Sequence, residues 1–146
     1  MFRFRLQAVE TIRQNEEEQA QLKLGREQTI LQNHLNRLAD YKQERGEMVD
    51  SLAAKEKEKV KGSMVQFYME AIRSKEVLMK MLGNTIASQE QVVHQARMDL
   101  TEAVKERKVV EVIRKRDYEK YLAEERKKEQ NESDEMAVLR YGRSSS

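Results

Sequence analysis

The feature that most constrains the fold is a seven-residue repeat in the second half of the chain. Two series of positions, each spaced by seven residues, run along this half, and the second series lies three positions after the first. They are Val65, Ile72, Met79, Ile86, Val93 and Leu100, and then Tyr68, Lys75, Leu82, Gln89, Ala96, Ala103 and Val110. An average spacing of about 3.5 residues puts both series on one face of a helix, and that face must coil around a partner helix.

A weaker repeat of the same kind runs through the first half. Most of its members are leucines seven residues apart, and the set is Leu24, Leu31, Leu38, Arg45 and Leu52, with Leu35 and Val49 four positions beyond their neighbours. Upstream, the apolar residues do not continue this register; they are Leu6, Val9, Ile12 and Ala20. We therefore expect a stutter near Ala20–Leu24, where the supercoil locally unwinds.

Residues 57–63 mark the place where the chain reverses. The run KEKEKVK has no apolar stripe, and Gly62-Ser63 follows it. Glycine readily adopts the positive φ that ends helices, and serine caps the helix that follows. Gly83-Asn84 offers a second break, but the repeat passes through it without a phase shift, which favours one continuous helix there.

The sequence thus predicts an all-α fold in which two long helices form an antiparallel coiled-coil hairpin, because an amphipathic helix needs a partner for its apolar face. The alternative is a parallel homodimer with a helical linker. The Gly-Ser break and the unequal quality of the two seams favour the hairpin. The predicted bounds are about 4–57 for the first helix, 58–63 for the turn and about 64–139 for the second helix, in one domain over 1–141 with a disordered tail at 142–146.

Composition agrees with long helices and excludes several classes of protein. Charged residues make up 37% of the chain, against about 25% in an average globular protein. Aromatic residues make up only 5%, and there is no proline to break a helix. The 28 basic and 26 acidic residues nearly balance, unlike the basic stripe of a nucleic-acid binder. The absence of cysteine excludes disulfides and thiolate metal sites.

The sequence contains no catalytic or metal-binding constellation. His34 and His94 are the only histidines and lie far apart. Glu16, Glu17 and Glu18 point about 100° apart on a helix and cannot converge on one ion. No apolar run approaches the roughly 20 residues that cross a bilayer, and we find no signal-peptide core. We expect a non-enzymatic cytoplasmic protein without cofactor or metal, which binds no nucleic acid, does not insert into a membrane, and reaches the cell membrane only through partners.

The segment GSMVQFYMEAIRSKEVLMKMLG, residues 62–83, is an apolar stretch in the least charged part of the chain. Several of its apolar residues lie off the seam, where a two-helix hairpin leaves them exposed. They are Met64, Phe67, Met69, Ala71, Leu78 and Met81. Methionine is flexible and common on adaptable binding surfaces, and contiguous exposed apolar surface marks interaction sites. We expect a partner-binding surface here.

Both ends of the chain resemble the FliJ family of bacterial flagellar export proteins. The start is FRFRLQAVETIRQNEEEQAQLKLG. Residues 112–141, VIRKRDYEKYLAEERKKEQNESDEMAVLRY, hold a basic stretch, aromatics among Glu and Arg runs, an acidic pair and a short apolar ending. FYMEAI at 67–72 lies where the family has an aromatic pair after the hairpin turn. The resemblance covers nearly the whole chain.

The resemblance implies an antiparallel coiled-coil hairpin similar to the central stalk of rotary ATPases. The end that carries both termini would insert into the ring of the flagellar export ATPase and promote its assembly and hydrolysis. The other end would reach the cytoplasmic domain of the export-gate membrane protein. Members of the family also escort export chaperones.

The candidate contact residues follow from this resemblance. For the ATPase ring they are Arg3, Arg5, Arg13, Tyr118, Tyr121 and Arg126, because arginine pairs with carboxylates and tyrosine adds rigid contact area. For the export gate they are Phe67, Tyr68, Met69, Ala71, Leu78 and Leu82. The alternatives are a passive coiled-coil scaffold or tether, and a general export chaperone without effect on an ATPase.

Overall fold

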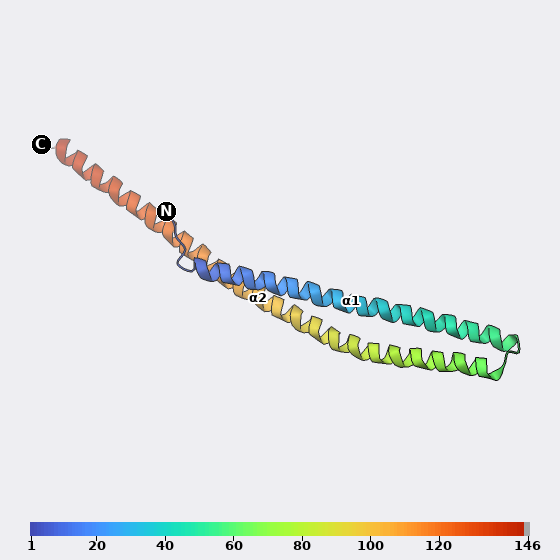
Figure 1. Ribbon diagram of the computed structural model, residues 1–146. Coiled ribbons are helices and arrows are strands. Elements are labelled where there is room, and N and C mark those ends of the chain that lie inside the picture. The colour runs from blue at the N-terminus through green and yellow to red at the C-terminus, as the bar shows by residue number, and fades with distance from the viewer. Residues whose placement is uncertain (145–146) are drawn as a thin grey trace. The chain divides into compact units, whose positions relative to one another are not determined.

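The computed structural model describes residues 1–144, and nearly all of them lie in two helices. Helix α1 spans Gln7–Lys57 and helix α2 spans Gly62–Ser144. The two helices pack side by side in opposite directions, joined by a short turn within the region predicted for the reversal (Figure 1). The prediction of an all-α antiparallel hairpin is confirmed.

The outer ends of both helices differ from the expected bounds. Helix α1 begins at Gln7 rather than near residue 4, because Phe4 is buried and its carbonyl accepts a hydrogen bond from the N–H of Gln7 at 3.1 Å, which closes a turn before the helix. Helix α2 continues to Ser144, so the expected disordered tail is helical at 142–144, while 145–146 lie outside the described residues. Glycine at position 142 costs a helix only about 1 kcal/mol relative to alanine, and no proline follows it.

A residue in the left-handed conformation ends α1, and this residue is a lysine. Lys59 has a φ of 55°, whereas Gly62 is helical. The N–H of Val60 bonds the carbonyl of Lys55 at 3.4 Å, and the N–H of Lys59 bonds that of Glu56 at 3.2 Å. These two bonds define a Schellman motif, in which glycine is the usual left-handed residue.

The start of α2 also differs from the prediction. The carbonyl of Lys61 accepts the N–H of Met64 at 3.0 Å, so Lys61 is the capping residue just before the helix, and Ser63 lies inside the first turn. The assignment of the helix stop to Gly62 and of the cap to Ser63 was therefore wrong. The predicted position of the reversal, near residues 57–63, was correct. The charged run there has no apolar face that could pack against a partner helix, so the paired helix ends.

The predicted seam of α2 faces α1. Every predicted position from Val65 to Val110 is buried or half-buried. The most deeply buried are Leu82, Ile86, Val93, Ala96 and Val110, between 2% and 9% exposed. Helix α2 passes through Gly83 without interruption. The seven-residue repeat and the continuous helix are thus confirmed.

The seam of α1 keeps one register from end to end, which overturns the predicted stutter near Ala20–Leu24. Buried or half-buried positions recur at the same spacing, and they are Glu10, Arg13, Glu17, Ala20, Leu24, Glu27, Leu31, His34, Leu38, Tyr41, Arg45, Met48, Leu52 and Lys55. Leu35 and Val49, expected near the seam, are exposed. The register was hidden in the sequence because charged and polar side chains occupy many seam positions.

The hairpin divides into two compact units. The termini unit consists of Met1–Glu18 and the chain from Thr101 onward, and the turn unit consists of Gln19–Leu100. The buried residues of the turn unit are apolar: Leu82, Ile86, Val93 and Ala96. Those of the termini unit are Phe4, Val110 and the acid Glu10. The two units therefore differ in what holds their helices together.

Two polar residues of the α2 seam in the turn unit, Gln89 and Lys75, have partners on α1. The amide of Gln89 donates to the backbone carbonyl of Glu27 at 3.0 Å and to its carboxylate at 2.6 Å. The ammonium of Lys75 lies 2.5 Å from the carboxylate of Glu44 and 4.8 Å from the ring centroid of Tyr41. An unpaired polar group in such a place would cost about 1–3 kcal/mol. These contacts also favour one register, since sliding the helices by a turn separates the partners.

Replacing Lys59 with glycine will raise the free energy of unfolding by about 1 kcal/mol, because a β-carbon in the left-handed conformation costs roughly this amount. Urea unfolding followed by circular dichroism measures the change. The matched variant is Gly62→Ala, which is expected to be neutral or stabilising because Gly62 is helical and an added β-carbon meets nothing within 4 Å. A large loss of stability in Gly62→Ala would show that the glycine holds the left-handed position.

Candidate partner-binding surfaces

Three aromatic side chains gather in the termini unit. The ring centroid of Phe2 lies 5.2 Å from that of Tyr118, edge to face, and 5.5 Å from that of Tyr121. The two tyrosines are three positions apart on α2 and share one face, with their centroids 6.4 Å apart. Aromatic pairs of this kind contribute about 0.5–1.5 kcal/mol beyond their buried area. The cluster therefore holds the segment before α1 against α2.

Two of the predicted arginines, Arg3 and Arg5, lie beside this cluster. The Nε of Arg5 donates to the carboxylate of Asp117 at 3.3 Å, while its side chain stays 73% exposed. A cleft of about 510 Å³ opens here, and it is lined by Phe2, Arg3, Arg5, Asp117, Lys120, Tyr121 and Glu124. The structure thus brings Arg3, Arg5 and both tyrosines together around Phe2.

The other two predicted residues, Arg13 and Arg126, lie outside this group. Arg13 donates to Glu16 at 3.0 Å and to Glu106 on α2 at 2.9 Å. The hydrogen bond with Glu16, and then the charge of Glu106, raise the pKa of the Arg13 guanidinium. Arg126 is exposed and donates to the carbonyl of Leu122 one turn earlier at 3.4 Å. Arg13 thus connects α1 to α2 through its ion pair with Glu106. Among the described residues, Arg126 bonds only its own helix and does not join the group around Phe2.

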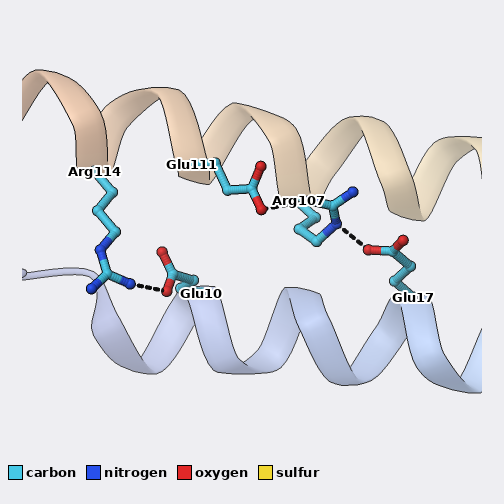
Figure 2. A network of polar contacts seen from close by, with 5 residues as sticks. All are labelled: Glu10, Glu17, Arg107, Glu111 and Arg114. Atoms are coloured by element: carbon cyan, nitrogen blue, oxygen red, sulfur yellow. Dashed lines mark hydrogen bonds and ion pairs between the residues drawn. The ribbon is translucent and has the colours of Figure 1, made fainter.

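Ion pairs occupy the seam of the termini unit (Figure 2). Arg114 donates to Glu10 at 2.5 Å. Arg107 bonds Glu17 on the facing helix, and Glu111 one turn along its own helix at 2.5 Å. The hydrogen bond with Glu111, followed by that with Glu17, raises the pKa of the Arg107 guanidinium. Charged pairs thus stand at positions that apolar side chains fill in an ordinary coiled coil.

In the turn unit, the predicted gate residues differ in exposure. The exposed ones are Phe67 at 67%, Met69 at 43% and Leu78 at 42%; Tyr68 and Ala71 are half-buried, and Leu82 is buried at 9%. Leu82 is a seam residue of the hairpin and packs against α1. The off-seam residues Met64 and Met81 are exposed, as expected.

Phe67 and Leu78 share one face of α2, while Met69 lies on the opposite face. Successive helical residues turn by about 100°. The eleven positions from 67 to 78 therefore return to about 20° from the start, whereas Met69 is turned by about 200°. Met81 falls on the same side as Phe67 and is 60% exposed. We call Phe67, Leu78 and Met81 the apolar row.

Sequence reasoning missed three residues that shape the termini unit: Phe2, Phe4 and Glu10. Phe4 is 8% exposed, and the guanidinium of Arg114 lies 5.9 Å from its ring centroid. The available signal was the alternation F-R-F-R at the start of the chain, which puts two aromatics beside the two arginines. Glu10 offered no signal, because the sequence alone does not distinguish a glutamate buried in a seam from a glutamate on the solvent-exposed face.

Replacing Phe2 with alanine will lower the stability of the termini unit by about 1 kcal/mol, since its contacts with both tyrosines are lost. Hydrogen exchange of backbone amides measures the loss as faster exchange in residues 2–10 and 114–121. The matched control is Phe67→Ala, because Phe67 also pairs with a tyrosine, at 6.0 Å, but is 67% exposed. Equal effects of the two substitutions would contradict a packing role for Phe2.

None of the described helices has an apolar stretch long enough to span a bilayer. Comparison with protein families matches residues 1–146, the whole of the sequence given, to the family described as flagellar FliJ protein. We found no similar curated protein and no similar solved structure. The family match and the antiparallel hairpin agree with each other, and the chain belongs to the FliJ family of flagellar proteins.

Proposed function

We propose that this component of the flagellar export apparatus is a non-enzymatic, stalk-like hairpin that binds the export ATPase through its termini unit and stimulates ATP hydrolysis. The observation that supports the proposal is the group of two exposed arginines and two tyrosines around Phe2. Arginine binds carboxylates through two parallel N–H groups, and tyrosine buries a large rigid area when it binds. Both residue types are common at the centres of protein interfaces.

The proposed mechanism uses binding alone. A ligand shifts an equilibrium only through a difference in its affinity for the two states. The hairpin would bind some states of the ATPase ring more tightly than others. This difference in affinity would favour the assembled ring and the states of it that hydrolyse ATP. Within the termini unit, the ion pairs from Arg13, Arg107 and Arg114 to the facing helix support a rod that withstands such binding.

For the other partner, we propose that the apolar row of the turn unit docks on the cytoplasmic domain of the export gate. Phe67, Leu78 and Met81 are between 42% and 67% exposed on one side of α2. Large apolar side chains that stay exposed on one side of a helix are typical of interaction sites. Leu82 would support the surface from beneath, because it packs against α1.

Escort of export chaperones is a second candidate function for the same unit. The exposed methionines favour it, since methionine side chains adapt to partners of different shape; they are Met64, Met69, Met81 and Met98. Escort and gate docking are compatible if they use different sides of α2. A passive tether, in contrast, predicts no change in ATPase activity.

Adding an equimolar amount of the chain to the purified export ATPase will raise its rate of ATP hydrolysis. The double variant Arg3→Ala with Arg5→Ala is expected to lose most of this stimulation, with affinity reduced about tenfold, or roughly 1.4 kcal/mol. The matched control is Arg37→Ala with Arg73→Ala, which removes two exposed arginines of the turn unit. No stimulation by the wild-type chain would leave the passive tether as the better hypothesis.

The double variant Phe67→Ser with Leu78→Ser will weaken binding to the cytoplasmic domain of the gate by at least about tenfold, because it removes two large anchors from one face. Isothermal titration calorimetry measures the affinity, and circular dichroism checks that helicity is unchanged. Val109→Ser with Val112→Ser is the control, since these valines are 60% and 49% exposed in the termini unit. Unchanged affinity in the Phe67 and Leu78 variant would disprove docking through the apolar row.

A further inference from the structure

The carboxylate of Glu10 is the most unusual polar group of the termini unit. The residue is 3% exposed and stands at a seam position of α1. Its Oε1 accepts a hydrogen bond from Nη1 of Arg114, but Oε2 is buried and has no hydrogen-bond partner among the described residues. Figure 2 shows the second oxygen turned away from the contact with Arg114. A buried acceptor without a donor destabilises a fold, so the carboxylate retains a strong capacity to bind a donor.

A cleft of about 450 Å³ opens beside this carboxylate. It is lined by Phe2, Glu10, Gln14, Glu111, Arg114, Lys115 and Tyr118. The rings of Phe2 and Tyr118 meet edge to face within it, with centroids 5.2 Å apart. The cleft is open to a side chain from another molecule, and Glu10, whose second oxygen is buried, is one of its lining residues.

The chemistry of the cleft selects a cation. The two acids and two bases that line it balance in charge, and one of the bases, Arg114, already bonds Glu10 and lies over the ring of Phe4. Gln14 and Lys115 carry donors, yet neither satisfies Oε2. A carboxylate oxygen binds the N–H groups of arginine or lysine most strongly, and aromatic faces attract the same groups.

We propose that this cleft is the receptor for one basic side chain, arginine or lysine, of a partner protein. The incoming group donates to Oε2 of Glu10 and lies against the rings of Phe2 and Tyr118. That the partner is the export ATPase rests on the proposed function above; the receptor itself rests on the geometry of Glu10. The termini unit then offers a partner two complementary features, the exposed arginines and a buried carboxylate.

The first test uses ethylguanidinium as a probe of the receptor, at concentrations too low to unfold proteins and at constant ionic strength. Nuclear magnetic resonance follows the signals of Phe2 and Tyr118. We expect saturable shifts, and at least fivefold weaker binding of ethylurea, which has similar N–H groups without the charge. Absence of saturation, or equal binding of both probes, would overturn the proposal without any substitution in the chain.

Variants then locate the site. Glu10→Gln keeps the shape of the side chain and is expected to weaken ethylguanidinium binding at least fivefold, whereas Glu18→Gln, an exposed acid on the same helix, leaves it unchanged. Equal binding by the Glu10→Gln chain would place the probe elsewhere and refute the receptor. Lys115→Met tests whether the chain's own lysine fills the cleft. For this variant we expect unchanged thermal stability and equal or tighter binding of ethylguanidinium. A loss of thermal stability would show that Lys115 itself occupies the cleft, which would refute an external occupant.

Binding to the ATPase separates the two proposals. If the wild-type chain binds the ATPase and Glu10→Gln weakens binding about tenfold, the partner supplies the cation. If the wild-type and Glu10→Gln chains bind equally well, this inference fails while the proposed function stands. If the wild-type chain does not bind the ATPase, the proposed function fails, and the probe titration alone decides the receptor.

Discussion

The contact between the two helices is the constraint on which the rest of the structure depends. Each helix has one face with a seven-residue repeat, and that face stabilises the helix only when it packs against a partner helix. Pairing in one register buries Leu82, Ile86, Val93 and Ala96 against the first helix. The side of each helix that takes part in this pairing determines which side chains are buried. The side chains on the other sides stay exposed and are the ones that partner proteins can contact.

The two units satisfy this constraint with different chemistry. In the turn unit, apolar residues fill the centre of the seam, and Gln89 and Lys75 find partners on the facing helix. In the termini unit, Glu10, Arg13 and Glu17 occupy seam positions and bond residues of α2. Ion pairs of this kind select a register more than they add stability, because each charge gives up water to form them. A seam built from ion pairs leaves the termini unit more polar and so better suited to a surface that other proteins bind and release.

The surfaces left by the pairing support the proposed division of roles. Around Phe2, two exposed arginines and two tyrosines form a group suited to an acidic partner surface, with the carboxylate of Glu10 beneath a neighbouring cleft. On the turn unit, the apolar row has no charge among its three members and faces away from the seam. One hairpin thus presents a charged and aromatic surface in one unit and an apolar surface in the other. That arrangement agrees with a family whose members belong to a multi-protein export apparatus.

The sequence by itself determined the helical class, the seam of α2 and the place of the reversal. A seven-residue repeat is a local property of one helix. The burial of residues such as Ile86 and Val93 can therefore be predicted without knowing the sequence of the helix that packs against them. It also indicated that Phe67 and Leu78 lie off the seam, since their spacing from it is again local. The resemblance at the two ends led to the family, which the comparison with protein families confirmed.

Only the tertiary structure decided what depends on pairing between distant residues. The register of α1 through Glu10, Arg13 and Glu17 was invisible because a charge is stable in a seam only when its counter-charge stands opposite, about a hundred residues away for Glu10 and Arg114. The left-handed conformation at Lys59 was likewise set by how α1 must end for α2 to return, which overrode the preference for glycine. The unpaired oxygen of Glu10 becomes buried only when the hairpin forms, and burial of that kind has no signature in sequence.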